Sequence, residues 1–340
     1  KDFKFDVVIG NPPYHEESTG EKPSSESVYN YFVEQGFALA SLGLFITPAR
    51  FLFNAGNTPK VWNQKMLNDE HLKVVYYEKD SQKVFSNTDI KGGIAIYLRD
   101  INKNFGAIGT FTPYLELNSI WKKVHNIDKT SLTDIMYNQN KFNLDELLKD
   151  YPKLKSVISS NGKEKRMTSG CLVYECFKEQ GDENDSIILG VINNKRYYKK
   201  INQKYVEEPH ENFRKYKVIM PANNGAGALG EVMSTPVVGT PFMGFTQTFI
   251  SLGAFDTEIE AKNALKYIKT KFCRVLLSIL KVTQNGKRDV WKCIPIQNFN
   301  MNSDIDWTKT VKDIDQQLYI KYGLNQEEIT FIETNVKPME

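Results

Sequence analysis

The sequence predicts a mixed α/β fold in three parts. Up to about residue 105, apolar strand-like runs alternate with helical patterns, which indicates an open α/β sheet. Residues 109–300 mix short strands with one long helical pattern, as α+β domains do. Two helical patterns with capping signals close the chain. We therefore expect domains at 1–108, 109–300 and 301–340.

Composition excludes several protein classes. The chain has 340 residues, enough for two or three cores, and its 41% hydrophobic and 25% charged content argues against disorder. No apolar run approaches the ~20 residues of a membrane helix, so we expect no membrane contact. The four cysteines form no C-x-x-C pair. This predicts a cytoplasmic protein with reduced thiols and no metal site.

The charge is small in total but uneven along the chain. Net charge is +3, yet residues 151–300 carry 23 Lys and Arg against 14 Asp and Glu. Residues 1–150 carry 17 against 19, and residues 301–340 carry 4 against 8. A basic middle region favours a polyanionic partner.

The first element, Phe5–Gly10, has the pattern of a buried strand, and Asn11-Pro12-Pro13-Tyr14 follows it directly. In open α/β sheets, ligands bind at the carboxyl ends of strands. Two prolines fix the backbone and remove two N–H groups, and Tyr14 offers an aromatic face. The alternative is a plain turn, since Asn and Pro are common turn residues.

Asn-Pro-Pro-Tyr after such a strand resembles motif IV of the amino-group methyltransferases, in the form typical of adenine-N6 enzymes. The resemblance implies S-adenosylmethionine as the methyl donor and an adenine that is flipped out of the duplex. The Asn11 side-chain oxygen and the Pro12 carbonyl would accept the two N–H groups of the adenine amine. Asn11, Pro12, Pro13 and Tyr14 are the expected catalytic residues, with Tyr14 stacking on the base.

The next elements alternate regularly. We expect a helix over Val28–Leu42 that ends at Gly43, and then a short strand over Leu44–Thr47. A helix over Pro59–Asp69 and a strand over Leu72–Tyr77 follow. The segment Pro48-Ala49-Arg50-Phe51-Leu52 matches a family segment and is expected at a second strand-to-helix turn that faces the site.

The block Asp89–Leu98, with its Gly92-Gly93 pair, resembles the motif VIII region of the Eco57I-like restriction–modification methylases. The resemblance implies that Phe85 is a second aromatic contact to the flipped base; a core phenylalanine is the alternative. Lys91 is a candidate phosphate contact, with a solvated lysine as the alternative. The order of the motifs resembles the gamma group of adenine methyltransferases.

The family carries a glycine-rich cofactor motif before motif IV, and this sequence begins at the strand that precedes motif IV. We therefore expect a fragment without the cofactor site, inactive alone and with no cofactor bound. An exposed sheet edge would also invite two copies of the chain to pair.

In the middle region, short strands are expected at Cys171–Phe177, Ile187–Ile192 and Tyr216–Met220. The run Lys195–Lys200 interleaves basic and aromatic residues, which suits a DNA backbone. Its candidate DNA contacts are Lys195 and Arg196. A solvated strand edge is the alternative.

Gly225–Gly230 spells G-x-G-x-x-G after a strand. Prolines at 236 and 241 follow too soon for the helix that would hold a cofactor, and no acidic residue follows at about 20 positions. A loop against the DNA backbone is preferred, with Asn223 and Asn224 as contacts and a plain glycine-rich loop as the alternative.

A helix is then expected over Thr257–Leu280 with Thr257 as its cap. It lies between an amide-rich segment, 241–250, and the loop Val282–Asp289. This arrangement resembles the target-recognition domains of the same enzymes. The candidate DNA contacts here are Gln247, Gln284, Asn285, Lys287 and Arg288.

The tail predicts a helix over Thr308–Tyr322 and a second helix capped by Asn325 and Glu328. It resembles the end of the Eco57I-like methylases and is expected to act as a packing brace. The leading hypothesis is site-specific DNA adenine-N6 methylation within a bacterial restriction–modification system. The alternatives are a DNA-recognition module alone, or a protein-glutamine methyltransferase, which shares Asn-Pro-Pro-Tyr.

Overall fold

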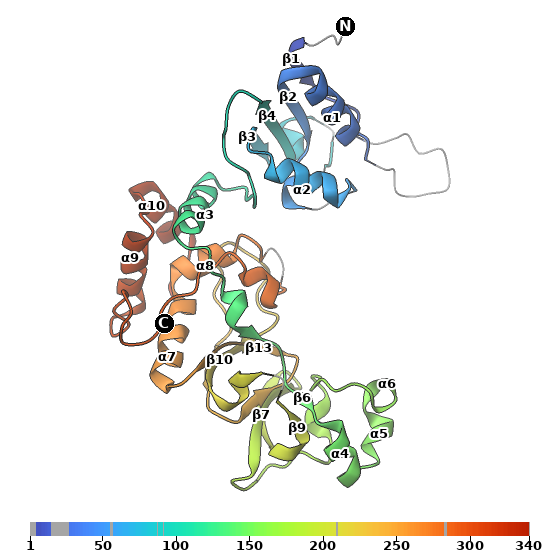
Figure 1. The fold of residues 1–340 in the computed structure, drawn as a ribbon, viewed down its shortest axis with the longest axis vertical. Helices are drawn as coiled ribbons and strands as arrows, with labels where there is room; N and C mark the ends of the chain where they lie inside the picture. The colour runs from blue at the N-terminus through green and yellow to red at the C-terminus, as the bar shows by residue number, and fades with distance from the viewer. Residues whose placement is uncertain are drawn as a thin grey trace. The chain divides into compact units, whose positions relative to one another are not determined.

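The computed structural model describes residues 5–14, 27–54, 57–86, 88–90, 92–208, 210–281 and 284–339. The chain divides into two compact units, Lys1–Asn118 and Ser119–Glu340 (Figure 1). Both combine strands and helices, so the predicted mixed α/β class is confirmed. The finer division at residues 108 and 300 stays a prediction.

Unit 1 is built on a four-stranded sheet with the order β1-β2-β4-β3. β1 (Phe5–Gly10) runs parallel to β2 (Ala40–Pro48). β4 (Ile94–Asp100) runs antiparallel both to β2 and to β3 (Leu72–Glu78). The carboxyl ends of β1, β2 and β3 therefore meet the start of β4 at one edge of the sheet.

Helices cover part of this sheet. α1 (Tyr29–Leu39) packs on β1 and β2, and α2 (Lys60–Asn68) packs beside the 3-10 turn η1 (Ala49–Phe53). A second 3-10 turn, η2, spans Ser81–Lys83. The core between them is largely aromatic; its buried members include Tyr29, Phe45, Phe51, Trp62 and Tyr97.

The expectation of a buried first strand is wrong. β1 is an edge strand, and its side chains at Phe5, Val7 and Ile9 are 47%, 46% and 74% exposed. α1 covers one face of β1, and the alternate side chains point to the other face, where no described residue buries them. An apolar run in the sequence does not by itself distinguish a fully buried strand from an edge strand that is exposed on one face.

The end of the first helix also differs from the prediction. The helix ends at Leu39, and β2 already begins at Ala40. Gly43 lies inside β2, where it pairs with Val8 and Arg99 and does not cap the helix. A Cβ atom at Gly43 would lie 2.7 Å from the Phe37 ring, so this glycine serves close packing of α1 on the strand.

Unit 2 contains a four-stranded sheet of order β11-β10-β13-β5, a three-stranded sheet of order β12-β7-β8 and the pair β6-β9 among its described residues. The strands are β5 (Met136–Tyr137), β6 (Lys141–Phe142), β7 (Asp185–Ile192), β8 (Lys195–Asn202), β9 (Val206–Glu207), β10 (Tyr216–Pro221), β11 (Val237–Gly239), β12 (Met243–Phe245) and β13 (Phe249–Phe255). The predicted strands at 187–192 and 216–220 are thus confirmed.

The helices of the second half are α3 (Leu115–Ile127), which begins in unit 1, α4 (Leu144–Asp150), α5 (Leu154–Val157), α6 (Ser159–Gly162), α7 (Glu258–Lys269), α8 (Lys271–Leu277), α9 (Val311–Lys321) and α10 (Gln326–Asn335). The 3-10 turns are η3 (Leu132–Ile135), η4 (Cys171–Val173), η5 (Gln203–Tyr205), η6 (Glu211–Arg214) and η7 (Arg288–Trp291). None of the described helices has the length and apolar character needed to cross a membrane.

Two predicted elements of unit 2 are wrong. Cys171–Phe177 is not a strand: it begins with η4, and its buried cysteines face a core built by α4, β7 and neighbouring turns. The expected helix over Thr257–Leu280 is two helices. Thr270 is not helical (φ −57°, ψ 149°), and its hydroxyl accepts from the Cys273 N–H as the cap of α8. The Thr257 cap of α7 is confirmed.

The tail forms as predicted. Asn325 and Glu328 make a reciprocal capping box at the start of α10. The Glu328 carboxylate is buried, and it also accepts from Ser119 and from Lys123 at 2.7 Å each. These contacts attach α10 to α3 within unit 2, which suits the expected bracing role.

Candidate functional site

The Asn-Pro-Pro-Tyr segment follows the carboxyl end of β1 directly and has no regular secondary structure. The Tyr14 hydroxyl donates a 2.8 Å hydrogen bond to the Asn11 side-chain oxygen. Pro12 is buried, whereas Asn11 and Pro13 are exposed and Tyr14 is half-buried. Burial raises the pKa of Tyr14 to about 12, so the hydroxyl stays protonated and can donate at neutral pH.

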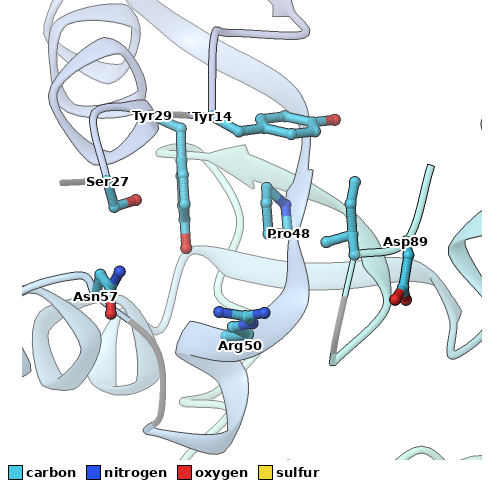
Figure 2. Close-up of a pocket in the computed structure, with 8 residues that line it drawn as sticks. Tyr14, Ser27, Tyr29, Pro48, Arg50, Asn57 and Asp89 are labelled. Atoms are coloured by element: carbon cyan, nitrogen blue, oxygen red, sulfur yellow. The ribbon is translucent and has the colours of Figure 1, made fainter. Parts of the chain in front are cut away.

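A cavity of about 180 Å³ lies beside Tyr14. The sheet topology brings three parts of its lining to one edge: the end of β1, the end of β2 and the segment before β4 (Figure 2). The start of α1 and the segment before α2 supply the rest. The lining residues are Tyr14, Ser27, Tyr29, Pro48, Arg50, Asn57, Asp89 and Ile90.

The cavity walls combine aromatic and charged groups. Tyr14 and Tyr29 contact each other edge to face, with ring centroids 6.4 Å apart. In the view of Figure 2, Tyr14 and Arg50 lie on opposite sides of Pro48, with Tyr29 and Asp89 to either side. Planar walls with a few polar groups are typical of sites for small aromatic ligands.

The sequence predicts part of the lining of this cavity. It singled out Tyr14 as a base contact and placed Pro48–Leu52 at a turn that faces the site, but it did not list Tyr29, Arg50 or Asp89 as site residues. The available signal was topological, because parallel strands bring their carboxyl ends together. Tyr29 carried no signal, since a tyrosine at the start of a helix is ordinary.

The sequence also predicts a base contact at Phe85 and a phosphate contact at Lys91. Phe85 is half-buried just after η2, with its N–H bonded to the Ser81 carbonyl, and it is not among the residues that line the cavity. Its contact to a base stays a prediction. Lys91 lies outside the described residues.

Four of the predicted DNA-contacting amides of unit 2, at Asn223, Asn224, Gln284 and Asn285, lie in a short two-stranded ladder. Asn223 pairs with Asn285 across an antiparallel bridge. The Asn224 N–H donates to the Gln284 carbonyl at 2.9 Å, and the Gly286 N–H donates to the Ala222 carbonyl at 2.8 Å. We call residues 222–224 with 284–286 the amide edge. Segments some 60 positions apart in the sequence thus share one surface, and Lys287 and Arg288 continue from it.

Exposure differs among these residues. Asn223, Gln284, Asn285, Lys287 and Arg288 are exposed. The Asn224 side chain instead serves the loop: its oxygen accepts from the Ser234 N–H at 3.0 Å, and its amide donates to the Val232 carbonyl at 3.3 Å. The Arg288 guanidinium donates to the Thr133 carbonyl at 2.8 Å.

Of the other three candidates, two lie on β8 and one lies between β12 and β13. Lys195 is exposed at the start of the edge strand β8. The Arg196 guanidinium donates to the Thr235 carbonyl at 2.6 Å and lies 5.5 Å from the centre of the Phe249 ring. Gln247 is exposed in the turn between β12 and β13. A DNA role for any of these residues stays a prediction.

The G-x-G-x-x-G loop holds a carboxylate of its own chain. The N–H groups of Ala226, Gly227 and Ala228 donate to the Glu231 carboxylate at 2.8–3.3 Å. Lys281, which is 4% exposed, forms an ion pair with the same carboxylate. Because these N–H groups already bind the Glu231 carboxylate, they are not available to a ligand. That this loop holds no cofactor stays a prediction.

Metal binding has no candidate in the described part of the chain, where no three His, Cys, Asp or Glu side chains gather closely enough to hold an ion. The four cysteines are buried and free. Burial raises the pKa of the Cys176 thiol to about 12 and raises that of Cys171 as well, which makes both poor nucleophiles at neutral pH.

Comparison with known proteins confirms the expected resemblance. Residues 1–85 match the model of the Eco57I restriction-modification methylase family. An uncharacterized adenine-specific methylase of Mycoplasma pneumoniae is 31% identical over 99 residues, which cover 28% of this chain and 24% of the relative. The match thus spans about a quarter of the length of that relative.

Two solved structures are also similar at low identity. The type IIG restriction endonuclease BpuSI is 10% identical with a TM-score of 0.31, over 98% of this chain and 53% of that one. The type IIL restriction-modification enzyme MmeI, solved in complex with DNA, is 9% identical with a TM-score of 0.38, over 97% of this chain and 56% of that one.

Proposed function

We propose, because residues 1–85 carry the methylase segment of the Eco57I restriction-modification family, that this chain is the base-accepting and DNA-recognition part of an adenine-N6 DNA methyltransferase. The observation that carries the proposal is the position of Asn11–Tyr14 at the carboxyl end of β1, beside a cavity with aromatic walls. The glutamine-methylating alternative receives no support from the relatives found.

The proposed chemistry starts from the poor nucleophilicity of an exocyclic amine. The lone pair of the adenine N6 atom is delocalised into the ring, and two acceptors aimed at its N–H groups draw the nitrogen toward a tetrahedral geometry. An amide oxygen has two lone pairs, so the Asn11 oxygen can accept from the base while it accepts from Tyr14. The Pro12 carbonyl is the second acceptor.

The protein holds these groups in position before the base arrives. Tyr14 fixes the Asn11 amide, and the two prolines restrict the backbone between them. Preorganised acceptors cost no rearrangement when the base binds, which is the main source of catalytic stabilisation in polar sites. S-adenosylmethionine would supply an electrophilic methyl group when bound. We propose no described residue as its binding site.

The second unit supplies recognition in this proposal. The amide edge presents Asn223, Gln284 and Asn285, which are side chains able to read base edges, beside the cations Lys287 and Arg288. Lys195 and Arg196 on β8 would contact phosphates and add salt-dependent affinity. A recognition module without chemistry is the competing reading, and it shares this surface.

The test uses the 340-residue chain and a pool of duplexes with a randomised centre. Repeated selection should enrich one sequence that contains an adenine. Replacing that adenine by 2-aminopurine should give a fluorescence increase on binding, because the base leaves the stack. Enrichment without any fluorescence change would leave only the recognition module, and absence of enrichment would contradict the whole proposal.

A further inference from the structure

We propose that Arg50 is a specificity-determining residue, which donates a hydrogen bond to a ring nitrogen of the purine that enters the cavity beside Tyr14. The inference rests on the proposed function, since it takes the cavity to be the base site. Arg50 is not among the site residues predicted from the sequence, and its role here is to recognise a purine ring nitrogen.

The fold directs Arg50 toward the cavity. β2 ends at Pro48, and the Ala49 N–H donates to the Gly93 carbonyl at 2.9 Å, which fixes the chain at the sheet edge. Gly92 has a φ of +94°, and a Cβ atom there would lie 2.7 Å from the Arg50 Cγ. The glycine therefore leaves room for the stem of the arginine, and the half-buried side chain lines the cavity floor (Figure 2).

The surroundings favour a base over a phosphate at this cation. The cavity is walled by the rings of Tyr14, Tyr29 and Pro48 and by the Ile90 side chain, which suit a flat ring. The Asp89 carboxylate lines the same cavity, and its negative charge would repel a phosphate.

The chemistry of adenine requires such a donor. Its amine offers two N–H groups, which Asn11 and Pro12 accept in the proposed function, and its ring offers only acceptors, at N1, N3 and N7. An arginine has five N–H donors and no acceptor, so it can donate to a ligand and to groups of the protein at the same time. Buried donors left unpaired are costly, so a ring without the matching nitrogen should be rejected.

The experiment measures the binding of free nucleosides to the 340-residue chain by ligand-observed NMR titration. The probes are 2′-deoxyadenosine and its 1-deaza, 3-deaza and 7-deaza analogues, each of which replaces one ring nitrogen by C–H. The intact chain should bind one of the three analogues about tenfold or more weakly than deoxyadenosine, as expected for a charged donor. Arg50→Met should bind deoxyadenosine as weakly as the intact chain binds that analogue, and should no longer distinguish the two.

The matched control is Lys65→Met, which removes a cation on α2 whose side chain is 67% exposed. It should leave every affinity unchanged within about twofold. Arg50→Lys keeps the charge but not the planar fork, and should recover only part of the discrimination. The melting temperature of each variant reports whether it folds.

The outcomes distinguish failure of the Arg50 role from failure of the base site in the proposed function. Deoxyadenosine binding with equal affinity for all three analogues would overturn the role of Arg50, even if every Arg50 variant failed to fold. Equal affinity of Arg50→Met and the intact chain for deoxyadenosine would overturn it as well. If the intact chain bound none of the nucleosides, the base site of the proposed function would fail, and the Arg50 inference would fail with it.

Discussion

The Tyr14 hydroxyl lies 2.8 Å from the Asn11 side-chain oxygen and donates to it, so two residues of the Asn-Pro-Pro-Tyr segment are joined before any ligand binds. The hydrogen bond sets the orientation of the amide, because its NH₂ group must then point away from Tyr14. It also divides the tasks of Tyr14 between a ring that lines the cavity and a hydroxyl that orients its neighbour.

These two tasks can be separated by substitution. Tyr14→Phe keeps the ring and should leave deoxyadenosine affinity within about threefold of the intact chain. Tyr14→Ala removes the stacking surface and should cost ~1–3 kcal/mol of binding free energy. The measurement is nucleoside titration by NMR, with Tyr31→Ala, a tyrosine that is 59% exposed on α1, as the control. Equal binding by Tyr14→Ala and the intact chain would show that the base lies elsewhere.

The Glu231 carboxylate should contribute stability through the loop that surrounds it. Burial by itself raises the pKa of Glu231, but Lys281 and the N–H groups of Ala226 and Gly227 outweigh it, and the net pKa is below the usual value. A carboxyl group with a lowered pKa in the folded state stabilises the fold above its unfolded pKa, and this contribution is lost as the pH falls through the folded pKa.

Glu231→Gln should therefore lower the free energy of unfolding by ~2–4 kcal/mol at pH 7, since it removes the carboxylate that neutralises the buried Lys281 cation. The difference from the intact chain should shrink as the pH falls below the usual carboxyl range. Urea unfolding at several pH values measures both effects. Glu258→Gln, in an exposed i,i+4 pair on α7, should change stability by less than ~0.5 kcal/mol. A constant difference across the pH range would contradict the assignment.

The glycine pair before β4 should be required for the shape of the cavity edge. A Cβ atom at Gly93 would lie 2.3 Å from the Glu78 carbonyl oxygen, and its φ of +79° is unfavourable for other residues. Gly93→Ala should cost more than the ~1–2 kcal/mol of left-handed strain alone. Gly106 has a similar φ of +73° with no atom within 4 Å of the added Cβ, so Gly106→Ala isolates the strain term. Thermal unfolding of both variants compares them, and equal losses would rule out the clash.

Local patterns predicted much of the fold because they act through neighbouring residues. The cap at Thr257 and the capping box at Asn325 depend on side chains three positions apart, and both were predicted. The break at Thr270 was not, because the apolar spacing continues through it. Its cause is tertiary: Asp315 from α9 accepts from the Lys271 and Phe272 N–H groups at 3.0 and 2.9 Å and satisfies the start of a second helix.

In the candidate site too, features set by neighbouring residues could be predicted, and features set by contacts between distant segments could not. Asn11–Tyr14 is contiguous and could be identified from its order alone. The amide edge joins Asn223 to Asn285, which are 62 positions apart, so the sequence offered the residue types without their pairing. The capture of Glu231 by the glycine-rich loop could not be foreseen from glycine spacing, because the same spacing suits any anion.

The most direct test of the central claim is methyl transfer by a protein that joins these 340 residues to a part that binds S-adenosylmethionine. DNA from cells that express it should carry N6-methyladenine within one recognised sequence. Asn11→Ala should abolish that methylation, by at least about a thousandfold in rate, since it removes an acceptor used in the transition state. DNA affinity should change by less than about threefold. Methylation that survives in Asn11→Ala, or methyl groups found on a base other than adenine, would contradict the account.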